Sequence, residues 1–199
     1  MALTTPNTQL AEAAGLARVV TAASDRLVWR WLGTSRFHDT RELTRRALTV
    51  QAVPDPGTLV AAGRAAQAVG DLGQALDYYN QALPIQRQVG DRAGEAATLT
   101  NIGAVHRARG ELDVALDYYN QALPIRRQVG DRAGEAVTRY NIAMIQRDLG
   151  NLAEAVAQLE QTVELDRQIQ HPDLAADTQM LHQIRQELSF SEADERLQN

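Results

Sequence analysis

The side chains that most often carry catalysis are few in this chain of 199 residues, and they are scattered. The chain has no cysteine and no lysine, which excludes thiolate zinc sites, cysteine nucleophiles and the lysine-containing phosphate loop. None of the histidines has a second histidine or a pair of carboxylates at ligand spacing. They are His38, His106, His171 and His182. The sequence therefore predicts no catalytic residue, no metal site and no cofactor, and we expect a protein that is not an enzyme.

Two of these histidines have simple structural interpretations. His106 lies one helical turn beyond Ile102 on an expected helix, so we interpret it as a packing residue. His171 precedes Pro172, and we expect it in a turn.

Net charge and hydropathy argue against further classes of protein. The formal net charge of -5 disfavours nucleic-acid binding, which usually requires a basic surface. No stretch approaches the roughly 20 apolar residues that span a bilayer, so we expect no membrane association. The first 20 residues lack a continuous apolar core and are interrupted by Glu12 and Arg18, unlike a secretory signal. A cytoplasmic location is the expectation.

An internal repeat organises the chain. Residues 75–96 and 115–136 differ only at Gln86 and Arg126, and a third, diverged copy keeps the same step of 40 residues. Each copy contains two apolar patterns of helical period separated by a glycine. Asp91 and Asp131 are expected to cap first helices. Asp71 with Gln74, and Asn151 with Glu154, resemble capping boxes at second helices.

Helix pairs without strands predict an all-α fold, an α-α superhelix or solenoid of antiparallel helix pairs. In the first two repeats a small residue, Ala, a bulky residue and Ala are spaced 12, 4 and 3 apart, as in Gly103, Ala115, Tyr119 and Ala122, and the third repeat matches loosely with Thr162 at the last position. This pattern resembles the tetratricopeptide repeat, whose usual length is about 34 residues. The longer period of 40 is similar to the variety in kinesin light chains and in bacterial signalling arrays.

The repeats define an expected domain organisation. Residues 1–54 are expected to form N-terminal helices, with a degenerate repeat as one interpretation. Beyond them we expect repeats at 55–90, 91–130 and 131–170, a capping helix at 171–189 and a frayed tail at 190–199.

The repeated aromatic stretch is interpreted as scaffold. Tyr79 and Tyr119 occupy the bulky position on the apolar stripe and are predicted to be core residues. Pro84 and Pro124 lie inside the second helices and predict a bend in the first two of them. The third repeat has Glu164 at this position and is expected to be straight.

The resemblance implies that function resides on the concave face lined by the first helices. Asn101 and Asn141 match an inward asparagine that bonds a ligand's backbone in many members of the family. For Arg107 and Arg147 two roles stay open: a bidentate contact with a ligand carboxylate, or a solvated or internal pair. The candidate partner-binding residues are Asn101, Asn141, Thr100, Tyr140, Arg64, Met144, Arg107 and Arg147.

These patterns favour a non-enzymatic scaffold that binds a peptide or protein in a concave groove. One alternative is a self-associating structural module, a homo-oligomer formed through N-terminal helices that carry Trp29 and Trp31. Another is the sensor portion of a bacterial signalling regulator, whose nucleotide-binding loop would lie elsewhere.

Overall fold

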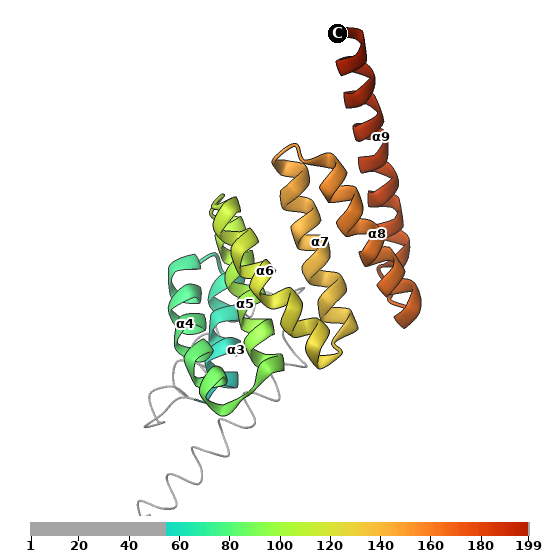
Figure 1. Ribbon diagram of the computed structural model, residues 1–199. Helices are drawn as coiled ribbons and strands as arrows, with labels where there is room; N and C mark the ends of the chain where they lie inside the picture. The colour runs from blue at the N-terminus through green and yellow to red at the C-terminus, as the bar shows by residue number, and fades with distance from the viewer. Residues whose placement is uncertain (1–54, 199) are drawn as a thin grey trace, which may run out of the picture. The chain divides into compact units, whose positions relative to one another are not determined.

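The computed structural model describes residues 55–198, with side chains as far as Ala193, and this part of the chain is entirely helical (Figure 1). It contains no strand, which confirms the predicted all-α fold of consecutive helix pairs. The helices are α3 (Pro56–Ala68), α4 (Leu72–Val89), α5 (Arg92–Ala108), α6 (Leu112–Val129), α7 (Arg132–Asp148), α8 (Leu152–Ile169) and α9 (Leu174–Gln198).

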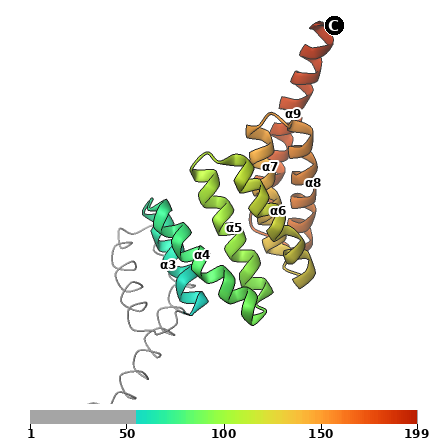
Figure 2. The ribbon, with the colours of Figure 1, turned by 60° about the vertical axis from the view of Figure 1, so that its left-hand side comes forward.

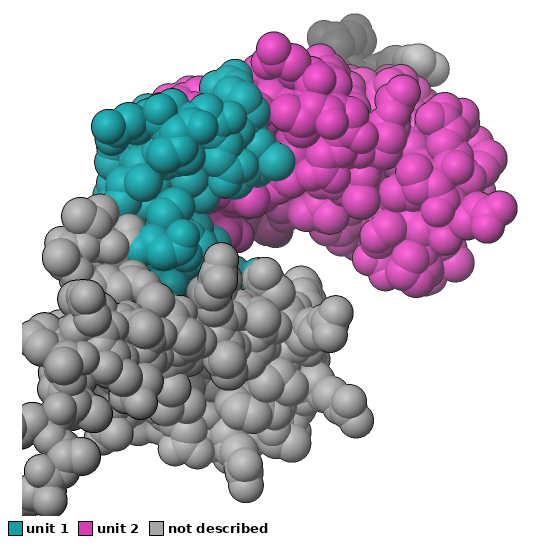
Figure 3. All heavy atoms as spheres, turned by 90° about the horizontal axis from the view of Figure 1, so that it is seen from below, with its two compact units in different colours: residues 1–94 teal, residues 95–199 magenta. Residues whose placement is uncertain are grey.

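The chain divides into two compact units, residues 1–94 and residues 95–199 (Figure 3). In the described part of the first unit, α3 packs against α4. In the second unit, α6 packs on α7, α7 on α8 and α8 on α9, and Figures 1 and 2 both show α7, α8 and α9 side by side. The helix pairs α3–α4, α5–α6 and α7–α8 fall within the ranges expected for the three repeats.

Caps and left-handed glycines set the helix boundaries largely as expected. The Asp91 and Asp131 carboxylates accept hydrogen bonds from the amides of Gly94 and Gly134, at 2.9 and 2.8 Å. Helices α4 and α6 end at Gly90 and Gly130 with φ of 72° and 71°, a conformation that glycine adopts without strain.

The predicted capping box at Asn151 is wrong. The Asn151 side chain makes no cap hydrogen bond and donates instead to Gln146 Oε1 at 2.8 Å. Glu154 accepts from Gln158 and is therefore engaged along the helix. At Asp71 the aspartate half of the box is present, because Asp71 accepts from the Gln74 amide at 3.2 Å.

A glycine facing a tyrosine ring joins the two helices of the second repeat. Tyr119 is fully buried, and a Cβ added to Gly103 would lie 2.7 Å from its ring. Gly63 and Tyr79 repeat the same contact at 2.5 Å within the first unit. The third repeat has an alanine and a leucine at these positions, and both are fully buried. The predicted core role of the tyrosines is confirmed.

The two internal prolines do not interrupt their helices. Helix α4 continues through Pro84 and α6 continues through Pro124, and both prolines lie on the exposed side. The predicted bend at these residues stays a prediction.

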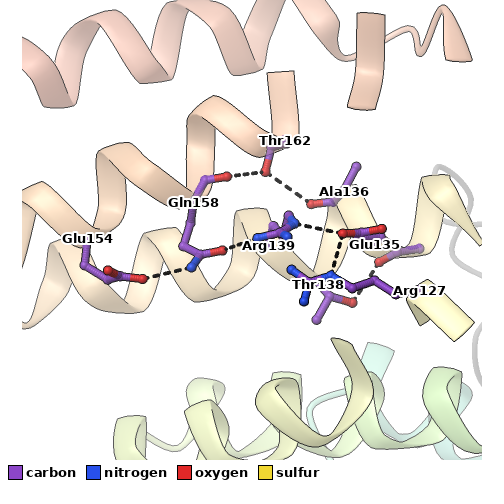
Figure 4. A network of polar contacts seen from close by, with 9 residues as sticks. Arg127, Glu135, Ala136, Thr138, Arg139, Glu154, Gln158 and Thr162 are labelled. Carbon is purple, nitrogen blue, oxygen red and sulfur yellow. Dashed lines mark hydrogen bonds and ion pairs between the residues drawn. The ribbon is translucent and has the colours of Figure 1, made fainter. Parts of the chain in front are cut away.

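The third repeat contains a buried polar network that the apolar pattern does not predict (Figure 4). Arg139, 7% exposed, stands where the preceding repeat has the core residue Leu99. Its guanidinium donates to Glu135 on α7 at 3.1 Å and to Gln158 on α8 at 2.8 Å. Burial acts to raise the pKa of Glu135, but hydrogen bonds from Arg127 and Arg139 outweigh burial and lower it.

Helix α9 occupies the position of the first helix of a fourth repeat. Thr138 on α7 and Thr178 on α9 are 40 residues apart, and each hydroxyl donates to the carbonyl four residues before it. Leu181 and Ile184 of α9 join the core cluster of α7 and α8, as expected of a capping helix. Helix α9 continues to Gln198, so residues 190–198 are helical where we expected a frayed tail.

We predict that Gly103→Ala destabilises the protein by about 1–2 kcal/mol, because the added methyl collides with the Tyr119 ring. In a Tyr119→Leu background, which reproduces the third repeat, the same substitution is expected to cost nothing, since the smaller side chain leaves room. Urea unfolding of the four proteins of this double-mutant cycle measures both values. An equal loss in the two backgrounds would show that the ring contact is not the cause.

Candidate functional site

The candidate residues of the second unit lie along two equivalent helical stripes. On α7 they follow the spacing i, i+3, i+4, i+7 and i+10, which places them on one helical face. The candidates are Tyr140, Asn141, Met144 and Arg147, and the series starts at Val137, which the sequence interpretation did not single out. Thr100, Asn101 and Arg107 occupy the same register on α5.

The two asparagines are the free polar groups of these stripes. Asn101 and Asn141 are partly exposed, and within the described chain neither side chain makes a hydrogen bond. Each amide carries both a donor and an acceptor, the combination that can pair with a peptide backbone.

Two other candidate residues are buried and make their contacts within the chain itself. The hydroxyl of Thr100, 8% exposed, donates to the Ala96 carbonyl at 2.8 Å. Met144, 7% exposed, packs in the core cluster with Leu181 and Ile184 of α9. Tyr140 is partly buried at the edge of the same cluster.

Both candidate arginines of the second unit meet carboxylates of their own chain. Arg147 contacts Glu187 of α9 through two hydrogen bonds of 2.9 and 2.6 Å. This contact is the bidentate arginine–carboxylate geometry considered for a ligand. The hydrogen bonds from Arg147 lower the pKa of Glu187. Arg107 lies 4.0 Å from Asp148, a looser pair. These arginines therefore connect successive first helices.

Arg64 lies in the other unit, partly buried on α3. Its charge acts on the Tyr79 hydroxyl, although burial dominates and raises the pKa of Tyr79. The Tyr79 hydroxyl donates to Gln67 at 3.1 Å. The residue equivalent to Gln67 is Arg107, which has no acceptor atom, and the Tyr119 hydroxyl has no partner among the described residues.

His106 serves packing, as predicted. Its ring stacks on Tyr118 with centroids 5.3 Å apart, and its Nδ1 contacts Glu111. The segment with His38, Trp29 and Trp31 lies outside the described residues, as does the predicted self-association surface.

The sequence interpretation missed a pocket at the turn between α8 and α9. Its volume is about 360 Å³. Val137 and Tyr140 of the α7 stripe form one wall. The residues that line it are Ala136, Val137, Tyr140, Asp166, His171, Asp173, Ala176 and Asp177.

Three carboxylates and one histidine give this pocket its electrostatics. Asp166 is 1% exposed, and its Oδ1 lies 3.8 Å from His171 Nδ1. That nitrogen also accepts a hydrogen bond from the Asp173 amide at 3.3 Å. Burial, together with the hydrogen bond and charge of Asp166 and the charge of Asp173, raises the pKa of Asp177 to about 7.

A comparison between repeats would have indicated this pocket. Asp166 stands where the earlier repeats have Gln86 and Arg126, and Asp177 stands where the second and third repeats have Ala97 and Val137. Acidic residues at positions that are neutral or basic in the other repeats were the available signal.

The tetratricopeptide repeat model matches residues 56–128 and 94–168. The two matches together cover more than half of the chain, and they coincide with the helix pairs described above. The chain belongs to the tetratricopeptide repeat family. No curated protein matches the sequence.

Solved structures of low sequence identity share the fold. One is described as a kinesin light chain with nearly identical TPR-like repeats from Podosopora anserina, with 19% identity and a TM-score of 0.70 over 92% of this chain and 93% of that one. BtubC (BKLC) from P. vanneervenii has 17% identity and a TM-score of 0.70 over 96% and 88%. The apo form of RapI has 13% identity and a TM-score of 0.76 over 89% and 65%.

The described residues hold no group of three or more histidine or acidic side chains arranged to bind a metal ion. No helix in the same range has the length and apolar character needed to cross a membrane.

We predict that Asp177→Asn raises the melting temperature at pH 8. The Asp177 pKa rises from 3.8 to about 7 on folding, so between these values the folded state binds a proton that the unfolded state lacks. The wild-type free energy of unfolding therefore falls as pH rises through this window, and asparagine removes that loss. Thermal unfolding at pH 4, 6 and 8 should show a gap that widens with pH.

Asp117→Asn removes one exposed carboxylate of α6 and serves as the control for the change in net charge. A gap between Asp177→Asn and the wild type that does not change between pH 4 and pH 8 would contradict the prediction.

Proposed function

We propose that this protein is a non-enzymatic scaffold that binds an extended or helical peptide segment of a protein partner along its first helices. One observation carries the proposal: Asn101 and Asn141 occupy equivalent positions on α5 and α7, partly exposed and without hydrogen-bond partners in the described chain. Polar groups on rigid helices at a regular step suit the regular donors and acceptors of a peptide backbone.

The engagement of the neighbouring residues supports this assignment. On α7, Met144 is buried and Arg147 is held by Glu187 of α9, and on α5 Thr100 is buried, so these neighbours are fixed by contacts within the chain. A site that is already ordered loses less conformational entropy on binding than a mobile one. We therefore assign partner contact to Asn101, Asn141 and Tyr140, and we regard Arg107 and Arg147 mainly as internal links.

The family supports the class of function. Tetratricopeptide repeats form solenoids that act as interaction scaffolds, with specificity set by a few side chains. Catalysis has no support in the arrangement of the described side chains. The partner must share a compartment with this protein, and we expect that compartment to be the cytoplasm.

Replacement of both asparagines tests the proposal. A partner captured from the native host is first reduced to its binding peptide, and the affinity is then measured by titration calorimetry. Asn101→Ala with Asn141→Ala should weaken binding at least about tenfold, because two or more backbone hydrogen bonds are lost.

The matched control is Asn80→Ala with Asn120→Ala, which removes the equivalent pair of exposed asparagines from the outer helices α4 and α6. This variant should bind as the wild type does. Equal affinities for the two double variants would exclude the face that carries Asn101 and Asn141 as the binding site.

A further inference from the structure

The turn between α8 and α9 carries a reversal of charge relative to the turn after α6. In the second repeat, Arg126 at the end of α6 pairs with Asp131 of the next turn. The residues 40 positions later are Asp166 and His171, which face each other at 3.8 Å. The carboxylate and the basic group have exchanged places. The later turn therefore buries an acidic group where the earlier one holds an arginine.

One oxygen of the buried carboxylate at this turn lacks a hydrogen-bond donor among the described residues. This oxygen is Oδ2 of Asp166, which is 1% exposed and lines the pocket. Asp177 faces it and can donate to it only while protonated. An unpaired buried carboxylate is costly, so a cation placed between Asp166 and Asp177 would be stabilised by both.

The other groups that face these two carboxyls add no fixed positive charge. Tyr140 comes from α7, His171 and Asp173 come from the turn, and the remaining lining residues are apolar. His171 Nδ1 accepts a hydrogen bond from the Asp173 amide at 3.3 Å and lies 3.8 Å from Asp166 Oδ1 and 3.7 Å from Asp173 Oδ2. The pocket is therefore acidic around its polar groups.

The remaining walls fit the stem of a long side chain. Ala136, Val137 and Ala176 are small and apolar, and Tyr140 adds an aromatic side chain to the lining, a residue type that attracts cations. A volume of about 360 Å³ accommodates one such side chain. We propose that this pocket binds a basic side chain, an arginine or a lysine, of the protein partner.

The location of the pocket connects it to the peptide site, and the inference rests on the proposed function for its partner. Val137 and Tyr140 line the pocket and lie on the same face of α7 as Asn141. A peptide whose backbone pairs with Asn141 therefore runs beside residues that line the pocket. The partner segment is a peptide with a basic residue beside the part that the asparagines bind.

The pocket is tested with a probe that needs no partner. N-acetyl-arginine methylamide is titrated into the full chain, and its uncharged isostere N-acetyl-citrulline methylamide is the matched ligand control. Amide NMR shifts of residues 166–177 report occupancy. We expect saturable shifts with the arginine derivative and none with the citrulline derivative.

Substitutions of the two carboxyl groups, Asp166 and Asp177, and a change of pH test their role in binding. Asp177→Asn should weaken arginine binding about tenfold, whereas Asp117→Asn should leave it unchanged. Binding should strengthen from pH 5.5 to pH 8, since Asp177 loses its proton in that range. Asp166→Asn is a second variant. If it fails to fold, Asp177→Asn carries the test.

Equal shifts with both derivatives, or unchanged arginine affinity in Asp177→Asn, would overturn the inference. The two proposals fail separately. If the arginine derivative does not bind while the asparagine variant loses its partner, the groove stands without the pocket. If the arginine derivative binds and the asparagine variant keeps its partner, the pocket stands without the groove.

Discussion

Close contact between the two helices of a repeat is the constraint on which the other features depend. In the second repeat Gly103 allows the Tyr119 ring to lie directly on the backbone of α5, and one additional methyl would collide with it. In the third repeat Ala143 and Leu159 hold these two positions, and the smaller leucine side chain leaves room for the alanine methyl. Because this contact fixes how α5 meets α6 and how α7 meets α8, it also fixes which residues of each first helix remain available outside the core.

Helix α9 packs against the third repeat and supplies partners to its side chains. Helix α9 covers the apolar edge of α7 and α8 with Leu181 and Ile184, and Glu187 binds Arg147 through two hydrogen bonds. An arginine that a single repeat would leave for a ligand is therefore part of the connection between neighbouring first helices. Asn101 and Asn141 stay free of hydrogen bonds within the described part of the chain.

Two of the differences between the second and third repeats place a charged group in a buried position of the third. Arg139 replaces a core leucine and is bound by Glu135 and Gln158, whereas Asp166 replaces an arginine, and its Oδ2 has no hydrogen-bond donor among the described residues. The same low dielectric environment acts on both groups, and the difference lies in their partners. The first change yields a closed internal network and the second yields an acidic pocket, which is why the pocket and not the network is the candidate for binding.

The sequence by itself determined the all-α class, the helix pairs, the aspartate caps at α5 and α7 and the core role of Tyr79 and Tyr119, because these follow from local periodicity and hydrogen bonding. It could not show that Glu187 holds Arg147, that Arg139 is buried, or that Asp166 and Asp177 face one another. Each of these contacts joins residues that are 11 or more positions apart or on different helices. Only tertiary packing brings such charges together, and their energies depend on burial and on partners that no local pattern specifies.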